Sequence, residues 1–444
     1  MASKFPKQQI NFKRGWPNPS LLPVAHIKAA ADTVLSNPSI AIPGLLYGPD
    51  LGYEPLREEI AKWLTKFYAP SNPILSGRIC ITGGASQNLA CILQAFSDPL
   101  YTRNVWMVAP TYYLACGIFE DSGFAGKLRA VPEDEEGIDM RFLGQAILKS
   151  EAAARLEGND KPTIKPNRPW GKIYSHIIYA VPTFSNPSSK TMSLARRSEL
   201  VHLARDYDAL IITDDVYDFL QWSVSEEVDS AINWGKAVLP RLVDIDRELD
   251  GGAERGGADG FGNVASNGSF SKIIGPGVRT GWNEGTDKFT FALSLTGSTK
   301  SGGAASQLTA TFIFQLLQSR TLHHHILRTL QPFYATNYRT LLVAITTYLL
   351  PLGLTLQSQP AREIVGGYFV WLTLPPPLTG KELSRRALEE ENLIVTFGEM
   401  FEVKGDEEGA RFTRELRLCF AWEEEGRLVE GVERLACVIR RMKG

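Results

Sequence analysis

The hydrophobic positions of this chain form two recurring patterns, short apolar runs and amphipathic stripes. A continuous apolar run at residues 209–213 is typical of a strand in a parallel sheet that is covered on both faces. Residues 54–68 instead carry apolar side chains at helical spacing. This stripe consists of Leu56, Ile60, Trp63, Leu64 and Phe67. Further apolar runs at residues 79–82, 105–109 and 175–181 are interpreted as strands. Strands therefore alternate with helices between about residues 75 and 280, which predicts a doubly wound, mostly parallel sheet.

The pattern changes on either side of this region. Residues 1–45 are rich in proline and predict an extended arm with one helix near residues 24–35. Beyond Pro351, strands and helices indicate an α+β module. The predicted fold class is α/β, with a large domain whose mostly parallel, seven-stranded-type sheet is flanked by helices. A smaller α+β domain is expected from the N-terminal arm and the C-terminal segment.

The expected division has three parts: an arm with part of the small domain at residues 1–45, a large domain at residues 46–320 and a C-terminal small domain at residues 321–444. Two segments fit no predicted element. Residues 248–268 are rich in glycine and are predicted to form a mobile surface loop, and residues 157–172 have the composition of an inserted loop.

Composition limits the function classes. The 444 residues are 44% hydrophobic and carry a formal net charge of -2, which is typical of a globular enzyme and gives no electrostatic argument for nucleic acid or an anionic membrane. No apolar run is long enough to span a bilayer. The five cysteines are odd in number and are interpreted as reduced, buried thiols. A cytoplasmic location is expected, although the basic first residues leave a mitochondrial presequence open.

The stretch from Ser269 to Trp282 places one lysine in a polar, glycine-rich turn. Ser269 lies three residues before Lys272, and Arg279 lies seven residues after it. A lysine that forms an imine with an aldehyde cofactor must be partly desolvated, so that it can lose its proton near neutral pH. Hydroxyl groups and a fixed guanidinium are suitable for holding a phosphate. The alternative is an ordinary glycine turn with Lys272 in solvent.

Three other candidate sites follow predicted strands at their carboxyl ends, where ligands bind in such sheets. Ala85 and Ser86 lie between a glycine turn and a helix start, which presents free backbone N–H groups to an anion, although a plain helix cap is as common. Tyr112 can stack on a flat ring or be a core tyrosine. Asn186, before Pro187, can donate a hydrogen bond to a ligand oxygen or bond only its own backbone.

Asp214 and Asp215 follow the apolar run at residues 209–213. Two adjacent carboxylates at the end of a buried strand are costly unless a partner compensates them, and a protonated heterocyclic nitrogen is one such partner. One carboxylate can point inward and the other outward, because strand side chains alternate. Histidines and further acids at ligand spacing are absent, so no metal is predicted. Arg417, inside another apolar strand, requires a carboxylate partner.

The order and spacing of these features resemble the class I/II aminotransferases, the fold type I enzymes that use pyridoxal 5'-phosphate. The resemblance runs from the Gly-Trp-Pro-Asn-Pro segment that begins at Gly15 to Arg417. Within this family the chain looks most like the branch that contains 2-aminoadipate and kynurenine aminotransferases. The resemblance implies transfer of an amino group from an amino acid, of the 2-aminoadipate or aromatic type, to a 2-oxo acid such as 2-oxoglutarate.

The resemblance also implies a role for each matching residue. Lys272 bonds to the cofactor and then moves the proton between Cα and C4′, Asp214 keeps the pyridine nitrogen protonated, and Tyr112 stacks on the ring. The other implied cofactor contacts are Ala85, Ser86, Asn186, Tyr217, Ser269, Arg279 and Tyr47. Arg417, in preference to Arg414, is implied to grip the substrate α-carboxylate, with Asn186 and Gly15 beside it. Tyr47 is implied to reach the site of the neighbouring subunit, which predicts a homodimer.

Two alternatives stay open in the sequence. A lyase, decarboxylase or carbon–carbon bond-forming enzyme of secondary metabolism would use the same cofactor residues. Related aminoadipate enzymes draw a side-chain arginine from a segment upstream of Gly15 that is short here, and Arg14 is the candidate to replace it. A transcription regulator with an aminotransferase-like domain is the second alternative, but it would require a DNA-binding domain before Gly15.

Overall fold

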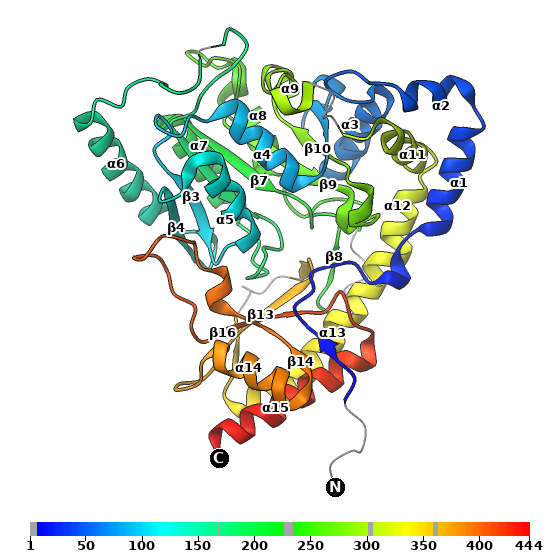
Figure 1. The fold of residues 1–444 in the computed structure, drawn as a ribbon, viewed down its shortest axis with the longest axis vertical. Helices are drawn as coiled ribbons and strands as arrows, with labels where there is room; N and C mark the ends of the chain where they lie inside the picture. The colour runs from blue at the N-terminus through cyan, green and yellow to red at the C-terminus, as the bar shows by residue number, and fades with distance from the viewer. Residues whose placement is uncertain (1–6, 167, 226–233, 301–304, 358–362) are drawn as a thin grey trace.

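The computed structural model describes residues 7–166, 168–225, 234–300, 305–357 and 363–444. Residues 1–6, where the predicted arm begins, lie outside the described residues. Figure 1 shows a larger part, built around a central sheet, above a smaller part that contains both the beginning and the end of the described chain. No helix in the described ranges combines the length and apolarity needed to cross a bilayer.

The large sheet has the strand order β2-β10-β9-β7-β6-β3-β4-β5. The pairs from β9 through β7, β6 and β3 to β4 are parallel, whereas β10 runs antiparallel to both of its neighbours and β5 is antiparallel to β4. The predicted mostly parallel sheet is therefore confirmed. The strands are β2 (Ile79–Thr82), β3 (Val105–Ala109), β4 (Leu128–Asp134), β5 (Gly137–Ile138), β6 (His176–Ala180), β7 (Ala209–Asp214), β9 (Val264–Ser269) and β10 (Gly281–Glu284).

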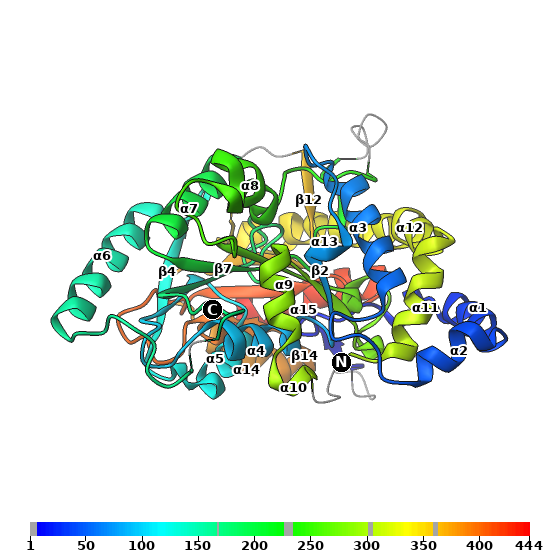
Figure 2. The same ribbon diagram turned by 90° about the horizontal axis from the view of Figure 1, so that it is seen from above.

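Helices cover both faces of this sheet, as Figure 2 shows from above. The strands carry apolar side chains on each side because successive residues point to opposite faces. Met107 of β3 packs in one apolar cluster, and its neighbour Trp106 packs in the other. The first cluster includes side chains of α4 (Ala85–Phe96), α5 (Tyr113–Phe119) and α9 (Asp287–Ser294), and the second includes those of α6 (Met140–Leu156), α7 (Leu194–Asp206) and α8 (Leu242–Glu248).

The smaller part is built on a four-stranded antiparallel sheet in the order β11-β13-β16-β15. These strands are β11 (Thr355–Leu356), β13 (Phe369–Thr373), β15 (Thr396–Phe397) and β16 (Glu415–Cys419). The helices α13 (Gln331–Tyr348), α14 (Gly380–Glu391) and α15 (Glu425–Lys443) lie beside it (Figure 1). The two parts are joined by the antiparallel pairing of β8 (Gln221–Ser223) with β12 (Ile364–Gly366).

The N-terminal segment belongs to both parts. Its strand β1 (Ile10–Asn11) pairs in parallel with β14 (Leu393–Ile394) of the smaller part. The chain then passes to α1 (Val24–Leu35), α2 (Pro38–Leu45) and α3 (Glu54–Tyr68). All three contact α11 (Gln307–Gln318), which in turn contacts α12 (Thr321–His325). The predicted arm thus contains a second helix, α2, whose N-cap Asn37 accepts a hydrogen bond from the backbone of Ser39. The domain boundaries at residues 45 and 320 stay a prediction.

One sequence prediction is wrong at its carboxyl end. The glycine-rich segment 248–268 was predicted to be a surface loop, but Val264–Ser269 forms β9 in the middle of the sheet. The strand is buried although only its first two residues are apolar, because its polar residues lie between β7 and β10. Position 268 requires glycine, because the Cβ atom of any other residue would come within 2.1 Å of the Trp282 ring. Neighbouring strands, and not local hydrophobicity, decide this element.

Candidate active site

A cavity of about 640 Å³ lies at the edge of the large sheet where β3, β6, β7 and β9 end. Residues of the N-terminal segment and Arg417 of β16 complete its lining, so both parts of the molecule contribute to it. All the sequence-predicted site residues except Tyr47 line this cavity. They are Gly15, Ala85, Ser86, Tyr112, Asn186, Asp214, Tyr217, Ser269, Lys272, Arg279 and Arg417. Residues far apart in sequence meet because parallel strands bring their carboxyl ends to one edge.

Lys272 ends a short helical turn directly after β9. The Oγ atom of Ser269 accepts a hydrogen bond from the backbone N–H of Ser271 at 3.1 Å and fixes this turn. Burial lowers the pKa of Lys272 to about 8, because the charged amine is desolvated, although the nearby Cys419 and Asp214 oppose this effect. Its Nζ atom donates a hydrogen bond to the Gly15 carbonyl oxygen at 2.8 Å. An amine with a lowered pKa is available as a nucleophile and as a base near neutral pH.

The two adjacent carboxylates at the end of β7 face different surroundings. Asp214 lines the cavity, whereas Asp215 accepts a hydrogen bond from the hydroxyl of Thr213 at 2.7 Å. Tyr179 donates a hydrogen bond to Asp214 Oδ2 at 3.0 Å. The other oxygen, Oδ1, is buried and accepts no hydrogen bond from any residue that the structure describes. Burial raises the pKa of Asp214 to about 7, so its charged form requires a cationic partner.

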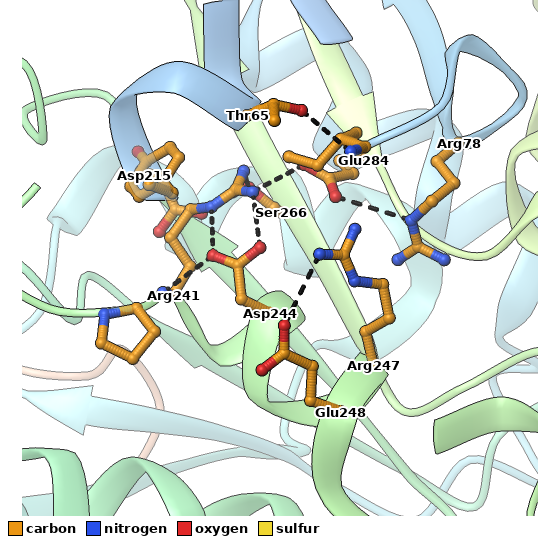
Figure 3. Close-up of polar contacts among 12 residues, drawn as sticks. Thr65, Arg78, Asp215, Arg241, Asp244, Arg247, Glu248, Ser266 and Glu284 are labelled. Atoms are coloured by element: carbon orange, nitrogen blue, oxygen red, sulfur yellow. Dashed lines mark hydrogen bonds and ion pairs between the residues drawn. The ribbon is translucent and has the colours of Figure 1, made fainter. Parts of the chain in front are cut away.

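Behind Asp215 lies a buried network of charged groups (Figure 3). Arg241 donates to the Asp244 carboxylate through Nε and Nη2, at 3.0 Å each, and its Nη2 lies 2.8 Å from Glu284. Its Nη1 donates to the Ser266 hydroxyl at 3.4 Å, and that hydroxyl donates to Asp215. Burial raises the pKa of Asp215, and the positive charge of Arg241 opposes this rise. The network therefore anchors Asp215 on the side of the strand away from the cavity.

The start of α4 has the geometry of an anion site. Gly84, its N-cap, has φ of 99°, which a residue with a side chain rarely adopts. A Cβ atom at Gly84 would lie 2.7 Å from Nη2 of Arg279, and this guanidinium donates from Nη2 to the Gly83 carbonyl at 2.9 Å. The first backbone N–H groups of a helix have no partner within the helix and carry partial positive charge. Ala85 and Ser86 therefore present an anion-binding end beside Arg279.

A cluster of buried asparagines, which we did not single out in the sequence, supports this helix start. Asn267 of β9 donates to the Ala85 carbonyl at 2.9 Å, and Asn88 donates to Asn267 at 2.9 Å and to Asn283 at 3.2 Å. Asparagines in strands and helices carry no distinctive spacing, so no local signal points to them. The cluster links α4 to β9, which ends at Ser269, and to β10, which begins two residues after Arg279.

Two tyrosines of the cavity, Tyr112 and Tyr217, keep their hydroxyl protons near neutral pH. Tyr112 is the N-cap of α5, and burial raises its pKa to about 12. Tyr217 is buried, and desolvation raises its pKa well above the ordinary value. Both hydroxyls are therefore hydrogen-bond donors to a ligand. The Lys272 Nζ atom lies 5.9 Å from the Tyr217 ring centroid, so the ring and the amine share the cavity.

Arg417 reaches the cavity from β16. Its Nη1 donates to Asn186 Oδ1 at 2.8 Å, and its Nη2 donates to the Lys13 carbonyl at 2.7 Å. The Nε atom is buried and has no hydrogen-bond partner in the described chain. The guanidinium carbon lies 4.0 Å from the Phe369 ring centroid. A guanidinium fixed in this way can bind a carboxylate through two parallel hydrogen bonds. Arg414, the other candidate, is exposed and does not line the cavity.

Tyr47 is the predicted site residue that this cavity does not contain. This residue is 91% exposed and lies two residues after the end of α2, a helix that lies at one side of the molecule (Figures 1 and 2). In the described ranges, no group of three or more histidine, cysteine, aspartate or glutamate side chains is placed to hold a metal.

The free cysteines are buried except Cys437, which is exposed on the polar side of α15, so the prediction of five buried thiols is wrong at this position.

Comparison with known proteins identifies the class of enzyme that this fold and cavity define. The described fold is similar to the solved kynurenine aminotransferase of Pyrococcus horikoshii, with a TM-score of 0.77 and 26% identity, covering 98% of this chain and 92% of that one. A multiple substrate aminotransferase of Thermococcus profundus gives a TM-score of 0.76 at 27% identity, with 98% and 92% covered. A model of the family "aminotransferase class I and II" matches residues 8–435, and the chain belongs to this family.

Relatives in sequence agree with the family. An uncharacterized protein of Saccharomyces cerevisiae is 34% identical over 418 residues, which are 90% of each chain. An aromatic-amino-acid aminotransferase of Thermococcus litoralis is 28% identical over 97% of this chain and 88% of its own length. A 2-aminoadipate transaminase of Thermus thermophilus is 27% identical, with 98% and 90% covered. The protein is a pyridoxal phosphate-dependent transaminase, and these comparisons do not favour the lyase alternative.

The residues of the cavity fit pyridoxal phosphate. The buried Asp214 Oδ1 has no hydrogen-bond donor among the described residues, and a protonated ring nitrogen would supply one. The anion-binding end formed by α4 and Arg279 suits a phosphate. Lys272, with its lowered pKa, lines the same cavity and suits an aldehyde. Each functional group of pyridoxal phosphate therefore has its own partner in the lining: Asp214 for the ring nitrogen, the start of α4 with Arg279 for the phosphate, and Lys272 for the aldehyde.

Proposed function

We propose that the protein transfers the α-amino group of 2-aminoadipate or an aromatic amino acid to a 2-oxo acid such as 2-oxoglutarate. The observation that carries this proposal is that Lys272, Asp214 and Arg417 line one cavity. The printed names of the relatives, which include an aromatic-amino-acid aminotransferase and a 2-aminoadipate transaminase, support these two types of donor.

Lys272 and Asp214 have the central roles in this mechanism. When bound, pyridoxal phosphate supplies an aldehyde for the amino group and a ring that withdraws electrons from the substrate Cα. Lys272 would hold the cofactor through its amine and, when that amine is free, would act as the base for the substrate Cα proton and as the acid that returns the proton at C4′. Asp214 holds the proton on the ring nitrogen, and its buried position makes this ion pair stronger than it would be in water.

Other residues position the cofactor. Ser269, Arg279 and the backbone N–H groups of Ala85 and Ser86 bind its phosphate. Tyr112 stacks on the ring and excludes water from one of its faces. The remaining ring contacts come from Tyr217 and Asn186, which donate hydrogen bonds to the phenolic oxygen.

Arg417 fixes the orientation of the substrate. Its guanidinium binds the α-carboxylate, with Asn186 and the backbone of Gly15 beside it. The hydrogen bond from Arg417 Nη1 to Asn186 Oδ1, at 2.8 Å, holds this guanidinium in the cavity before substrate arrives. By fixing the α-carboxylate, Arg417 would orient the bonds at Cα relative to the cofactor ring, and it would so favour proton transfer over the loss of a carboxyl group.

The enzyme is proposed to act as a homodimer in which Tyr47 reaches the cofactor phosphate of the partner. Tyr47 lies outside the cavity of its own chain, and the neighbouring Ile42, Leu45 and Leu46 are 58%, 67% and 63% exposed. A row of exposed apolar side chains of this kind marks a protein–protein contact. Light scattering should give about twice the mass of 49.1 kDa, and a Leu45→Glu variant should dissociate. A monomeric, fully active wild-type protein would refute the dimer.

The cytoplasm is the proposed location. The cysteines of the described chain are free, and four of them are buried, which suits a reducing compartment. Fluorescence microscopy of the tagged full-length protein checks this location. A signal that coincides with a mitochondrial marker would show that the basic N-terminal residues act as a presequence.

The amino-donor reaction tests the proposed function directly. Purified protein loaded with pyridoxal phosphate is mixed with 2-aminoadipate, an aromatic amino acid or a control amine, and the loss of the cofactor absorption band is recorded. The keto acid formed after addition of 2-oxoglutarate is identified by mass spectrometry. Lys272→Ala should abolish the reaction, because the cofactor bond and the proton-transfer group are lost together, whereas the exposed Lys381→Ala should react normally. A wild-type protein that reacts with no donor would overturn the proposal.

A further inference from the structure

Two buried tyrosines, Tyr368 and Tyr334, have no role in the proposed function. Both are 0% exposed, and neither of them lines the cavity. Tyr368 lies between β12 and β13, and Tyr334 belongs to α13. Burial raises the pKa of each hydroxyl above the ordinary value for tyrosine, so both groups keep their protons near neutral pH. A buried hydroxyl is costly unless it is hydrogen-bonded, so the partners of these two groups indicate what they do.

The two hydroxyls form a chain of hydrogen bonds that ends at the backbone of Lys272. The Tyr368 hydroxyl donates to the Lys272 carbonyl oxygen at 3.2 Å, and the two tyrosine hydroxyls lie 3.2 Å apart. A tyrosine hydroxyl has one proton to donate. Because Tyr368 uses its proton on Lys272, the bond between the two hydroxyls takes its proton from Tyr334. The Tyr334 oxygen accepts a hydrogen bond from the backbone N–H of Asn18, so the chain runs from the N-terminal segment through the smaller part to the lysine.

The ring of Tyr368 also faces the side chain of the lysine. The Lys272 Nζ atom lies 5.5 Å from the centroid of this ring and 5.9 Å from that of Tyr217. The two rings meet at 63°, with centroids 5.4 Å apart, so together they limit the directions in which the amine can swing. The backbone of Tyr368 is itself fixed, because its carbonyl oxygen accepts a hydrogen bond from the Phe420 N–H at 3.1 Å. Contacts within the chain therefore set the position of Tyr368.

We propose that Tyr368 is a positioning residue for Lys272, holding the lysine backbone through its hydroxyl and limiting the swing of the amine through its ring; this inference rests on the proposed function. A group that moves a proton must stay within hydrogen-bond distance of the atoms that it serves. A lysine side chain is long and flexible, so its reach is defined only if its backbone and its neighbours are fixed. Tyr368 acts through Lys272 and does not need to touch the substrate or the cofactor.

The variant Tyr368→Phe tests the hydroxyl, because it removes that group and keeps the ring. The first measurement is the rate at which the cofactor-free protein captures pyridoxal phosphate, followed by absorbance over a range of pH values. Burial lowers the pKa of Lys272 to about 8, so capture by the wild type should increase with pH around this value. A lysine released from its backbone anchor is less desolvated, so the midpoint in Tyr368→Phe should rise by about half a pH unit or more. Binding of inorganic phosphate should not change, because the start of α4 and Arg279 are untouched.

The cofactor-loaded enzyme gives a second measurement. Tyr368→Phe should lower kcat about tenfold for every donor, as expected for one hydrogen bond, with little change in KM, because the substrate contacts remain. Tyr334→Phe leaves the bond from Tyr368 to Lys272 in place, so it should change both measurements in the same direction but by less. Tyr338→Phe is the matched control, because it changes a tyrosine about one turn further along α13, and it should behave as the wild type.

An unchanged capture midpoint in Tyr368→Phe would overturn the inference, as would equal effects of Tyr368→Phe and Tyr338→Phe. Weaker phosphate binding in Tyr368→Phe would also overturn it, because the hydroxyl would then support the whole site and not the lysine. If Tyr368→Phe does not fold, Tyr334→Phe decides: a raised midpoint supports the inference, and an unchanged one overturns it. The capture measurement needs no amino donor, so its result is distinct from failure of the proposed function, in which the wild type reacts with no donor.

Discussion

Arg417 and Asn186, which lie 231 residues apart, are joined by a hydrogen bond of 2.8 Å from Nη1 to Oδ1. Arg417 belongs to the small antiparallel sheet, and Asn186 follows β6 of the large sheet. The contact therefore links the two parts of the molecule inside the cavity. Its partners are a fixed guanidinium and an amide whose remaining N–H groups can reach a ligand. One hydrogen bond thus connects the proposed substrate contact with the proposed cofactor contact.

Replacement of Arg417 by lysine should weaken the substrate complex. Lysine keeps the charge but cannot donate to Asn186, to the Lys13 carbonyl and to a carboxylate with the same planar geometry. We expect kcat/KM for every amino donor to fall at least about a hundredfold, which corresponds to the loss of charge-assisted hydrogen bonds. Steady-state kinetics with two donors measure this effect. The exposed Arg414→Lys is the control, and equal effects of the two variants would assign the contact to neither residue.

The ionisation of Asp214 should appear in the stability of the cofactor-free protein. The unfolded chain releases this proton near pH 3.8, whereas the folded state keeps it to about pH 7. The folded state thus binds more protons in this window, and the wild type loses stability as the pH rises through it. Asp214→Asn cannot ionise, so its free energy of unfolding relative to the wild type should rise between pH 4 and pH 7, by up to roughly 4 kcal/mol, and then level off. Urea unfolding at several pH values measures the difference, and a pH-independent difference would contradict the prediction.

Tyr179 should affect cofactor affinity through Asp214. Its hydroxyl donates a hydrogen bond to Asp214 Oδ2 at 3.0 Å and so favours the charged carboxylate. In Tyr179→Phe the pKa of Asp214 should rise further, and the dissociation constant of pyridoxal phosphate should increase about tenfold, as expected for one hydrogen bond to a charged group. Fluorescence quenching by the cofactor measures this constant. Tyr174→Phe is a matched control, because it removes another buried hydroxyl, which donates to the Gly262 carbonyl at 2.6 Å. The prediction fails if both variants bind the cofactor equally.

Gly84 should be essential for the anion site. Alanine at this position would place its Cβ atom 2.7 Å from Nη2 of Arg279 and would have to adopt φ of 99°. Gly126 also has positive φ, 78°, but a Cβ atom there meets nothing within 4 Å. Both Gly→Ala variants should therefore lose about 1–2 kcal/mol of stability from backbone strain. Only Gly84→Ala should also lose affinity for pyridoxal phosphate and for inorganic phosphate in the cofactor-free protein. Equal cofactor affinity in the two variants would contradict the prediction, because it would show that Arg279 can bind the phosphate when a Cβ atom is present at position 84.

Much of the site could be predicted from sequence because its chemistry is local. Lys272, Ser269 and Arg279 lie within a few positions of one another, although this stretch alone left an ordinary glycine turn open, and only its combination with the other motifs indicated a cofactor site. The end of β7 could also be recognised as a candidate site in the sequence, because two carboxylates at the end of a buried apolar run are costly unless partners compensate them. The sequence likewise predicted the mostly parallel sheet, because residues 79–82, 105–109 and 209–213 read as buried strands.

Other features depend on partners that are remote in sequence. Alternation along β7 predicts that Asp214 and Asp215 face opposite ways, and the resemblance implied Asp214 for the site. The physical reason comes from the fold, because the buried Arg241 network holds Asp215 while Asp214 lines the cavity. The sequence pattern did not predict β9, because this strand is buried by its neighbours β7 and β10 and is not itself hydrophobic. The sequence by itself determined the local strand–turn–helix units and the chemical groups they carry. The tertiary structure decided which of these groups share one cavity, and it put Arg14 there, because burial and charge pairing depend on the neighbours that folding brings together.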